Sequence, residues 1–251
     1  MRFFIPLFAL ITLLLPKDAS AEDDIPPFAR HVVTHVLMHE LGHAVFREFN
    51  VPILSNEEAL ADGFATFFVT QYLRDSAPDI IVSRARSWIY EDSEVDPAAY
   101  DHKGEHQLDI RRAYQTLCLF YGADPAEFAG HVAFAEFSER DLADCSDTAP
   151  DQFAAWTAVL EDLPRRSAGT DDPVRVIYGE GPMKDAFIAS GILEQVADFA
   201  RDFDWPNGPI TLHFDSCDGG ASWSRSKKRI LLCDSYVARF IAQGKAIAQG
   251  N

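Results

Sequence analysis

The sequence predicts an α+β protein, in which a mostly helical N-terminal region precedes a small β-sheet region. Apolar residues recur at helical spacing through most of the chain before residue 163. After residue 172 the pattern changes to short apolar runs bounded by glycine, proline and polar residues, which are typical of strands. The segment 163–172 contains Pro164, Gly169 and a charged cluster, so it is the best candidate for a linker between the two regions.

The N-terminal region is expected to consist of helices. The first is predicted over 28–49 and is ended by Asn50 and Pro52. Ser55 can cap a second helix that continues through Val69. Four more helices are predicted over 78–90, 106–121, 125–135 and 150–160, with a turn-rich loop at 90–104.

The C-terminal region is expected to have the element order β-α-β-β-α. Strands are predicted over 174–178, 210–214 and 229–233, an amphipathic helix over 183–203, and a last helix over the final 17 residues. The sequence Asp218-Gly219-Gly220 lies in the connection between the second and third strands and favours a turn there.

The first 21 residues have the features of an export signal. Arg2 supplies a positive charge, residues 3–15 are almost wholly apolar, and Ala19-Ser20-Ala21 offers the small residues that precede a cleavage site. An uncleaved anchor is the alternative, but the apolar run is shorter than a membrane-spanning helix requires. We therefore expect an exported protein, periplasmic or secreted, with no membrane span after signal cleavage.

The net charge limits the kinds of partner that we expect, and the cysteine content indicates disulfides. The net charge is −17, from 39 acidic and 22 basic residues, and an acidic surface repels phosphate backbones, so no nucleic acid partner is expected. Four cysteines in an exported chain predict two disulfides. Three pairings are possible, and the two local ones, Cys118–Cys145 and Cys217–Cys233, are favoured.

One pentapeptide predicts the chemistry. His39-Glu40-Leu41-Gly42-His43 is an H-E-x-x-H motif within the first predicted helix. Residues four apart share a helix face, so His39 and His43 can bind one zinc ion (Zn²⁺), while Glu40 lies beside an open coordination position. A chance occurrence on a surface helix is the alternative, and the acid-rich helix that follows argues against it.

The second predicted helix offers a third ligand. Glu58 can coordinate the ion, and Asp62 lies one turn further, where it can accept the free N–H of a ligating histidine. Glu57 competes with Glu58 for the role of ligand. Acidic residues are also common in the first turn of a helix that binds no metal.

These residues resemble the thermolysin-like zincins whose third ligand is a glutamate. The resemblance implies a zincin-like fold, His39, His43 and Glu58 as metal ligands, Glu40 as general base, and Asp62 as the carboxylate that orients a histidine. The loop that joins the two motifs is shorter here than in thermolysin.

A closer resemblance is to a bacterial family of metallopeptidases of unknown function. Its members pair HELGHA with an E-E-x-x-A-D motif, to which Glu57–Asp62 is similar, and carry a later segment like that from His106 to Gly122. In that family the segment that resembles 210–236 precedes the zinc helix, whereas here it ends the chain. The segment order therefore looks circularly permuted, which a fold can tolerate when its termini lie close together.

Weaker signals surround this motif. His106 and Arg112 are expected to share a helix face, and either could stabilise the oxyanion of a tetrahedral intermediate or simply join two helices. His31 and His35 are too far along the helix to reach the same ion, so they are interpreted as boundary residues or a weak accessory site. By analogy with zincins, 229–232 could be an edge strand that binds an extended peptide.

The sequence thus predicts a zinc-dependent metallopeptidase that hydrolyses peptide or protein substrates with a zinc-activated water and Glu40 as general base. Residues 22–163 would form the helical zinc region, and 173–251 a subdomain packed on the zinc helix. Two alternatives stay open: a catalytically silent zinc-binding module, and a zinc amidohydrolase acting on a non-peptide substrate.

Overall fold

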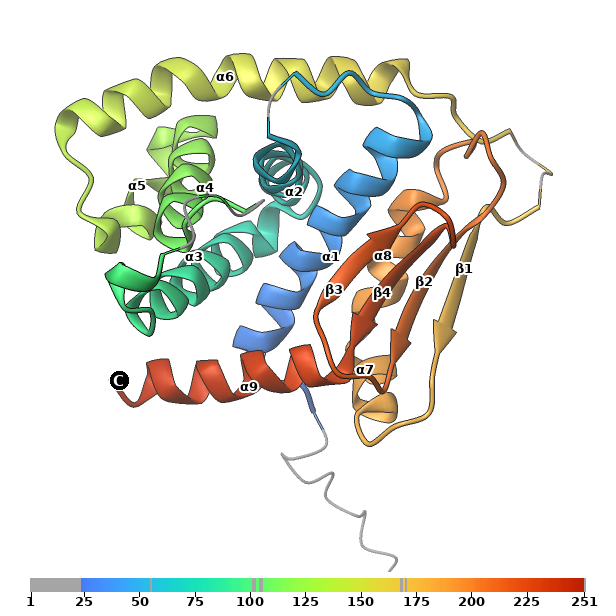
Figure 1. Ribbon diagram of the computed structural model, residues 1–251. Coiled ribbons are helices and arrows are strands. Elements are labelled where there is room, and N and C mark those ends of the chain that lie inside the picture. The colour runs from blue at the N-terminus through green and yellow to red at the C-terminus, as the bar shows by residue number, and fades with distance from the viewer. Residues whose placement is uncertain are drawn as a thin grey trace, which may run out of the picture.

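The computed structural model describes residues 24–54, 56–100, 103, 106–167, 169 and 171–250. The predicted export signal, 1–21, lies outside these residues. Within them the chain forms nine α-helices and one four-stranded mixed sheet, so the predicted α+β class is confirmed (Figure 1). None of the described helices is long and apolar enough to cross a lipid bilayer.

Helix α1 (Pro27–Glu48) runs through the centre of the molecule (Figure 1). It begins with Pro27, whose fixed φ and missing N–H suit the first position of a helix. Every residue from 32 to 42 is buried, because α1 packs against helices on one side and against the sheet on the other. The motif residues of α1 are therefore held by packing on several sides.

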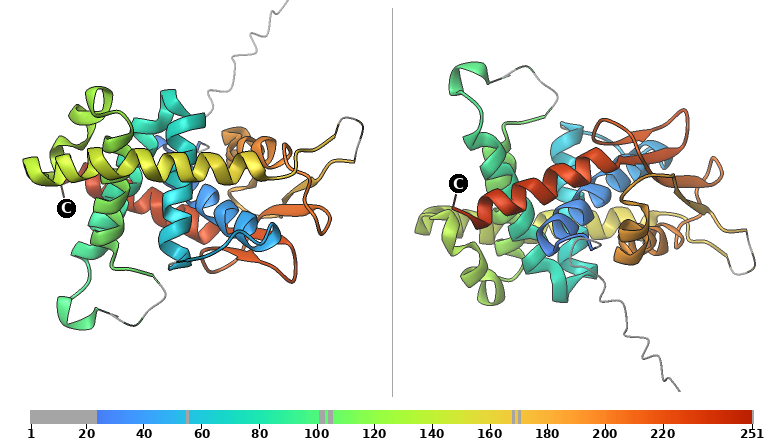
Figure 2. Two further views of the ribbon diagram at one scale, coloured as in Figure 1. Left: turned by 90° about the horizontal axis from the view of Figure 1, so that it is seen from above. Right: turned by 90° about the horizontal axis from the view of Figure 1, so that it is seen from below.

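Five further helices follow α1, of which α2 and α3 pack directly against it. They are α2 (Glu57–Tyr72), α3 (Ala77–Ser93), α4 (Asp109–Ala123), α5 (Pro125–Val132) and α6 (Glu139–Asp162). The view from above in Figure 2 shows the long helix α6 lying across α2 and α4.

Several helix boundaries differ from the prediction, and the starts of α6 and α4 differ most. Helix α6 begins at Glu139 and contains Pro150 in its interior, whereas the prediction started the helix at that proline. The true start is the capping box formed by Ser138 and Asp141. Helix α4 begins at Asp109 rather than at His106, so His106 lies in the segment before the helix and not on one helix face with Arg112.

The sheet has the strand order β1-β2-β4-β3. Strands β1 (Val174–Tyr178), β2 (Ile210–Asp215) and β4 (Arg229–Cys233) are parallel, and β3 (Ala221–Ser224) pairs antiparallel with β4. The expectation that 229–232 forms an edge strand is wrong, because β4 has a neighbour on each side. The edge strand next to α1 is β3, which was not predicted.

Three helices complete the C-terminal region: α7 (Lys184–Ser190), α8 (Ile192–Ala200) and α9 (Asp234–Ala248). The predicted single helix over 183–203 is divided at Gly191, whose φ of 67° is left-handed and ends α7. Buried residues of both predicted regions belong to one continuous hydrophobic core. Whether the two regions are separate units stays a prediction.

Both disulfides have the local pairing that the sequence favoured. Cys118–Cys145 joins α4 to α6, and Cys217–Cys233 joins the segment after β2 to the end of β4.

Candidate metal centre

Three side chains from α1 and α2 converge at the predicted site. The Nε2 atoms of His39 and His43 lie 3.1 Å apart. Glu58 reaches them from α2, with Oε2 3.2 Å from His39 Nε2 and Oε1 3.4 Å from His43 Nε2. Among the described residues these three form a group whose ligand atoms all lie within 4.8 Å of one another and could hold a metal ion.

A carboxylate lies behind each histidine. His39 Nδ1 is 2.8 Å from Asp62 Oδ1, and His43 Nδ1 is 3.0 Å from Glu57 Oε1. A carboxylate can only accept a hydrogen bond here, so each Nδ1 carries the proton and each Nε2 presents a lone pair. The rings are thus in the tautomer that a metal ligand requires.

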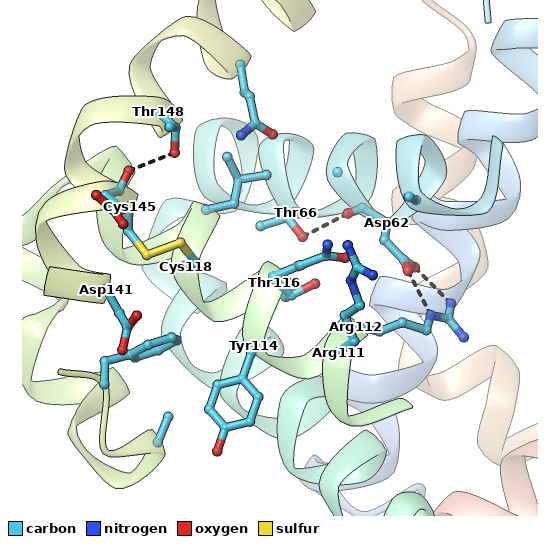
Figure 3. Close-up of a pocket in the computed structure, with 18 of the residues that line it drawn as sticks. Asp62, Thr66, Arg111, Arg112, Tyr114, Thr116, Cys118, Asp141, Cys145 and Thr148 are labelled. Atoms are coloured by element: carbon cyan, nitrogen blue, oxygen red, sulfur yellow. Dashed lines mark hydrogen bonds and ion pairs between the residues drawn. A yellow bond between two sulfur atoms is a disulfide. The ribbon is translucent and has the colours of Figure 1, made fainter. Parts of the chain in front are cut away.

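Arginines hold these carboxylates in turn. Arg112 donates two hydrogen bonds to Asp62, from Nε to Oδ2 at 2.8 Å and from Nη2 to Oδ1 at 2.9 Å, as Figure 3 shows. Arg47 donates from Nε to Glu57 Oε1 at 3.0 Å. Arg112 therefore holds the carboxylate that orients His39.

The arrangement fits a cation. Two Nε2 lone pairs and a carboxylate face one another at 3.1–3.4 Å, and this tautomer provides no donor between them. Oε2 of Glu58 is buried and accepts no well-aligned hydrogen bond, although His106 Nε2 lies only 2.9 Å away. Converging acceptors without a proton repel one another, and a cation between them removes that repulsion. Two imidazoles and one carboxylate are a donor set that suits zinc and leaves a coordination position open.

The pKa shifts indicate the same preference for positive charge. Burial would lower the pKa of His39, but the nearby carboxylates of Asp62 and Glu58, which favour a protonated ring, outweigh burial and raise that pKa to about 9. The pKa of His43 is also raised, because Glu58 and Glu57 outweigh its burial. The surroundings that stabilise an imidazolium here would also stabilise a metal ion, and ion and proton would compete for the site.

Glu40 lies next to the first histidine at the border with the sheet. It is 8% exposed, and the backbone N–H of Trp223 on β3 lies near its carboxylate. Burial raises the pKa of Glu40 above its ordinary value, although the two histidines and the Trp223 N–H oppose the shift. A carboxylate with a raised pKa is a stronger base, as proton abstraction from water requires.

A cleft of about 680 Å³ gives access to these residues. It is lined by Glu40, His43, Glu58 and His106 on one side and by β3 on the other. Half of the His106 side chain is exposed, 54%, so it is free to face a ligand in the cleft. The contribution of β3 was missed in the sequence, where its only signal is four residues between a glycine pair and a basic turn.

A second cavity, larger than the cleft, lies away from this site. A pocket of about 750 Å³ lies between α2, α4 and α6, next to the Cys118–Cys145 disulfide (Figure 3). Asp62 lines both this pocket and a smaller one beside the metal site, so its carboxylate stands in the wall between them. No histidine lines the large pocket, and the metal group lies outside it.

The structure therefore brings together His39, Glu40, His43, Glu58 and Asp62, as the sequence predicted. It places Glu57 on the far side of His43 rather than among the converging atoms, so Glu57 is not the third of the converging side chains.

Comparison with known proteins gives one match. No curated protein and no solved structure matches the chain. A family model described as "Putative metallopeptidase" matches residues 12–160, which include the H-E-x-x-H motif, Glu58, Asp62 and His106. The match ends before β1, so the permuted position of the sheet segment stays a prediction. Because the match covers more than half of the sequence, this chain belongs to that metallopeptidase family.

Proposed function

We propose that this protein is a zinc-dependent peptidase that cleaves peptide bonds with Glu40 as general base. The observation that carries the proposal is the convergence of two imidazole lone pairs and one carboxylate beside a buried glutamate at the border of an open cleft. Its cofactor would be a single Zn²⁺ held by His39, His43 and Glu58. When bound, zinc polarises a carbonyl group and lowers the pKa of water.

The residues of this chain have distinct tasks in the proposed reaction. Glu40 takes a proton from the attacking water on its carboxylate and passes it to the leaving amine. Asp62 and Glu57 keep the two imidazoles oriented. His106, close to Glu58 and half exposed, is positioned to donate a hydrogen bond to the substrate oxygen that becomes negatively charged.

Strand β3 supports a peptide as the substrate. It is the last strand of the sheet and pairs with β4 on one side only. Its residues line the cleft opposite the metal group, so an extended peptide could hydrogen-bond along it. The free edge thus provides a surface for main-chain recognition beside the catalytic residues.

We also propose that the protein works outside the cytoplasm. Its two disulfides support this, because such bonds persist in oxidising compartments. The predicted export signal leads to the same location, and N-terminal sequencing of the mature protein tests it by locating a cleavage after Ala21.

The first test compares two variants with the wild-type protein. Glu40→Gln should retain one zinc per chain and lose hydrolysis by a factor of about 100 or more, because it keeps the shape of the side chain but cannot accept a proton. His43→Ala should lose stoichiometric zinc, since two protein ligands remain. Metal analysis and digestion of a peptide library, with and without chelator, provide the readouts.

The outcomes separate the alternatives. Wild-type protein without stoichiometric zinc contradicts the metal centre. Zinc binding without peptide cleavage favours the silent binding module or an amidohydrolase for non-peptide substrates. Full activity in Glu40→Gln, after contaminating proteases are excluded, contradicts the role of Glu40.

A further inference from the structure

A buried arginine without a carboxylate partner lines a pocket next to the metal site. Arg84 on α3 is 4% exposed, and no carboxylate of the described residues lies within 4.0 Å of its guanidinium nitrogens. Its Nη1 donates to Ser87 Oγ at 3.2 Å, while its Nε is buried and has no hydrogen-bond partner. A buried charge of this kind costs free energy unless something opposite in charge binds to it.

Arg112, which lines the same pocket, has the carboxylate partner that Arg84 lacks. Its Nε and Nη2 both donate to the carboxylate of Asp62, at 2.8 and 2.9 Å. Arg84 has no such partner, and Glu91, an acid on the same helix, is engaged with Arg239 at 2.9 Å. Burial lowers the pKa of Arg84, which Tyr236 and Glu91 oppose only through space.

The aromatic surroundings of Arg84 compensate for its charge only in part. The guanidinium carbon lies 3.9 Å from the centre of the Trp88 ring, and that of Arg112 lies 4.6 Å from the same ring. Two cations thus share one indole, and such contacts contribute about 0.5–2 kcal/mol each. The fork of N–H donors on Arg84 remains matched to a planar anion that can accept two hydrogen bonds.

The position of the pocket relates this anion to the metal site. The pocket has a volume of about 180 Å³ and is lined by His39 and Glu40 as well as by His35 and Arg84. Because one pocket joins Arg84 to His39 and Glu40, an anion bound to Arg84 would lie beside the proposed metal ligand and the proposed general base. A substrate group that reaches Arg84 would therefore belong to a residue close to the scissile bond.

We propose that the pocket lined by Arg84 is a subsite for a substrate carboxylate on the residue next to the scissile bond. The inference that this pocket binds a substrate rests on the proposed function. The binding of a carboxylate to Arg84, by contrast, requires neither metal nor hydrolysis. The carboxylate comes either from an acidic side chain or from the C-terminus of the peptide, and matched probes distinguish these sources.

The test measures binding of four small probes to the purified full-length protein, both zinc-loaded and after chelator treatment. N-acetylglycine carries a C-terminal carboxylate and N-acetylglycinamide is its neutral match. N-acetylglutamate amide carries a side-chain carboxylate, with N-acetylglutamine amide as its neutral match. We expect one of the carboxylate probes to bind at least 10-fold more tightly than its neutral match, in both metal states, by calorimetry.

Variants then assign the preference to Arg84. Arg84→Met should bind both members of the preferred pair equally. Arg86→Met is the matched control, because Arg86 is an exposed residue of the same helix, and it should keep the wild-type preference. Arg84→Lys keeps the charge without the fork and should keep a smaller preference, so it carries the test if Arg84→Met does not fold.

Three results would overturn the subsite. The first is equal affinity of the wild-type protein for charged and neutral probes, including no binding of either. The second is a preference that survives in Arg84→Met, or at full wild-type size in Arg84→Lys. The third is a preference that disappears when zinc is removed, which would assign the carboxylate to the metal. None of these results bears on whether Glu40 and zinc hydrolyse peptides.

Discussion

Asp62 and Glu57 accept hydrogen bonds from the two histidines in the same way but differ in their surroundings. The side chains of Asp62 and its partner Arg112 are each 10% exposed, whereas Arg47, the partner of Glu57, is 48% exposed. Solvent screens an exposed ion pair, so its contribution to stability is small, while breaking a buried pair leaves an unpaired charge in the core. Mutations of the two carboxylates should therefore differ in their effect on the stability of the protein.

Asp62→Asn and Glu57→Gln should both weaken zinc binding by about 10- to 100-fold, because each loses the charge that orients a ligand. Only Asp62→Asn should also lower the free energy of unfolding, by about 3 kcal/mol, since it leaves Arg112 without a counter-charge. Zinc titration with a competing chelator and urea unfolding of the metal-free proteins measure the two effects. An unchanged stability of Asp62→Asn would contradict the buried pair.

At the scale of elements, the crossing of α4 over α6 depends on a glycine. A Cβ atom at Gly122 would lie 2.2 Å from the carbonyl oxygen of Cys145 and 2.5 Å from the Cβ of Ala149. The helices approach closely at this point, one turn from the disulfide between Cys118 and Cys145. The predicted helix ended at residue 121, but α4 continues through Gly122 to Ala123, and the glycine serves the packing of α4 on α6.

Gly122→Ala should destabilise the protein by about 1–3 kcal/mol, although alanine favours helices, because α6 must move away. Gly130→Ala in α5 is the matched control, since a Cβ atom there meets nothing within 4 Å. That control should be neutral or should stabilise by up to about 1 kcal/mol. Denaturant unfolding of both variants tests the close approach, and equal effects would refute it.

The elements also show where sequence patterns succeed. Helices α1, α2 and α3 lie where periodic apolar residues predicted them, because burial on a helix imposes that period. The prediction failed for β3, which has only four residues and too little alternation to be recognised. It failed for the start of α6 because Pro150 was taken as a boundary, whereas the capping box at Ser138 determines where that helix begins.

For the whole molecule, metal binding should be coupled to global stability. The proposed ligands come from α1 and α2, and both helices belong to the continuous hydrophobic core. The unfolded chain does not hold these three side chains together, so zinc binds the native state in preference. Binding of this kind stabilises the fold by mass action.

Zinc at about 1,000 times its dissociation constant should add about 4 kcal/mol to the free energy of unfolding. For a chain of this size the melting temperature should rise by roughly 10 °C. Scanning calorimetry of chelator-treated protein, with zinc added back, measures the shift. Glu40→Gln should show the same rise and His43→Ala little or none, while a wild-type melting temperature that does not respond to zinc would count against the site.

Those residues of the candidate site that follow from local geometry could be predicted from the sequence alone. His39, Glu40 and His43 lie within one helical turn, and Glu58 and Asp62 are also four apart, so their relative positions depend only on the helix repeat. The local disulfide pairing and the α+β class could be predicted for similar reasons, from spacing and composition.

The surroundings of those residues depend on how the chain folds. Glu57 lies behind His43, and Asp62 pairs with Arg112. Strand β3 approaches Glu40, and Arg84 is buried. Each of these features arises from contacts between elements that are distant in the chain. Such contacts depend on how helices and sheet pack around α1. The apolar pattern of one segment does not indicate which charged residue of another segment will pack beside it. These features could therefore not be predicted from a single sequence.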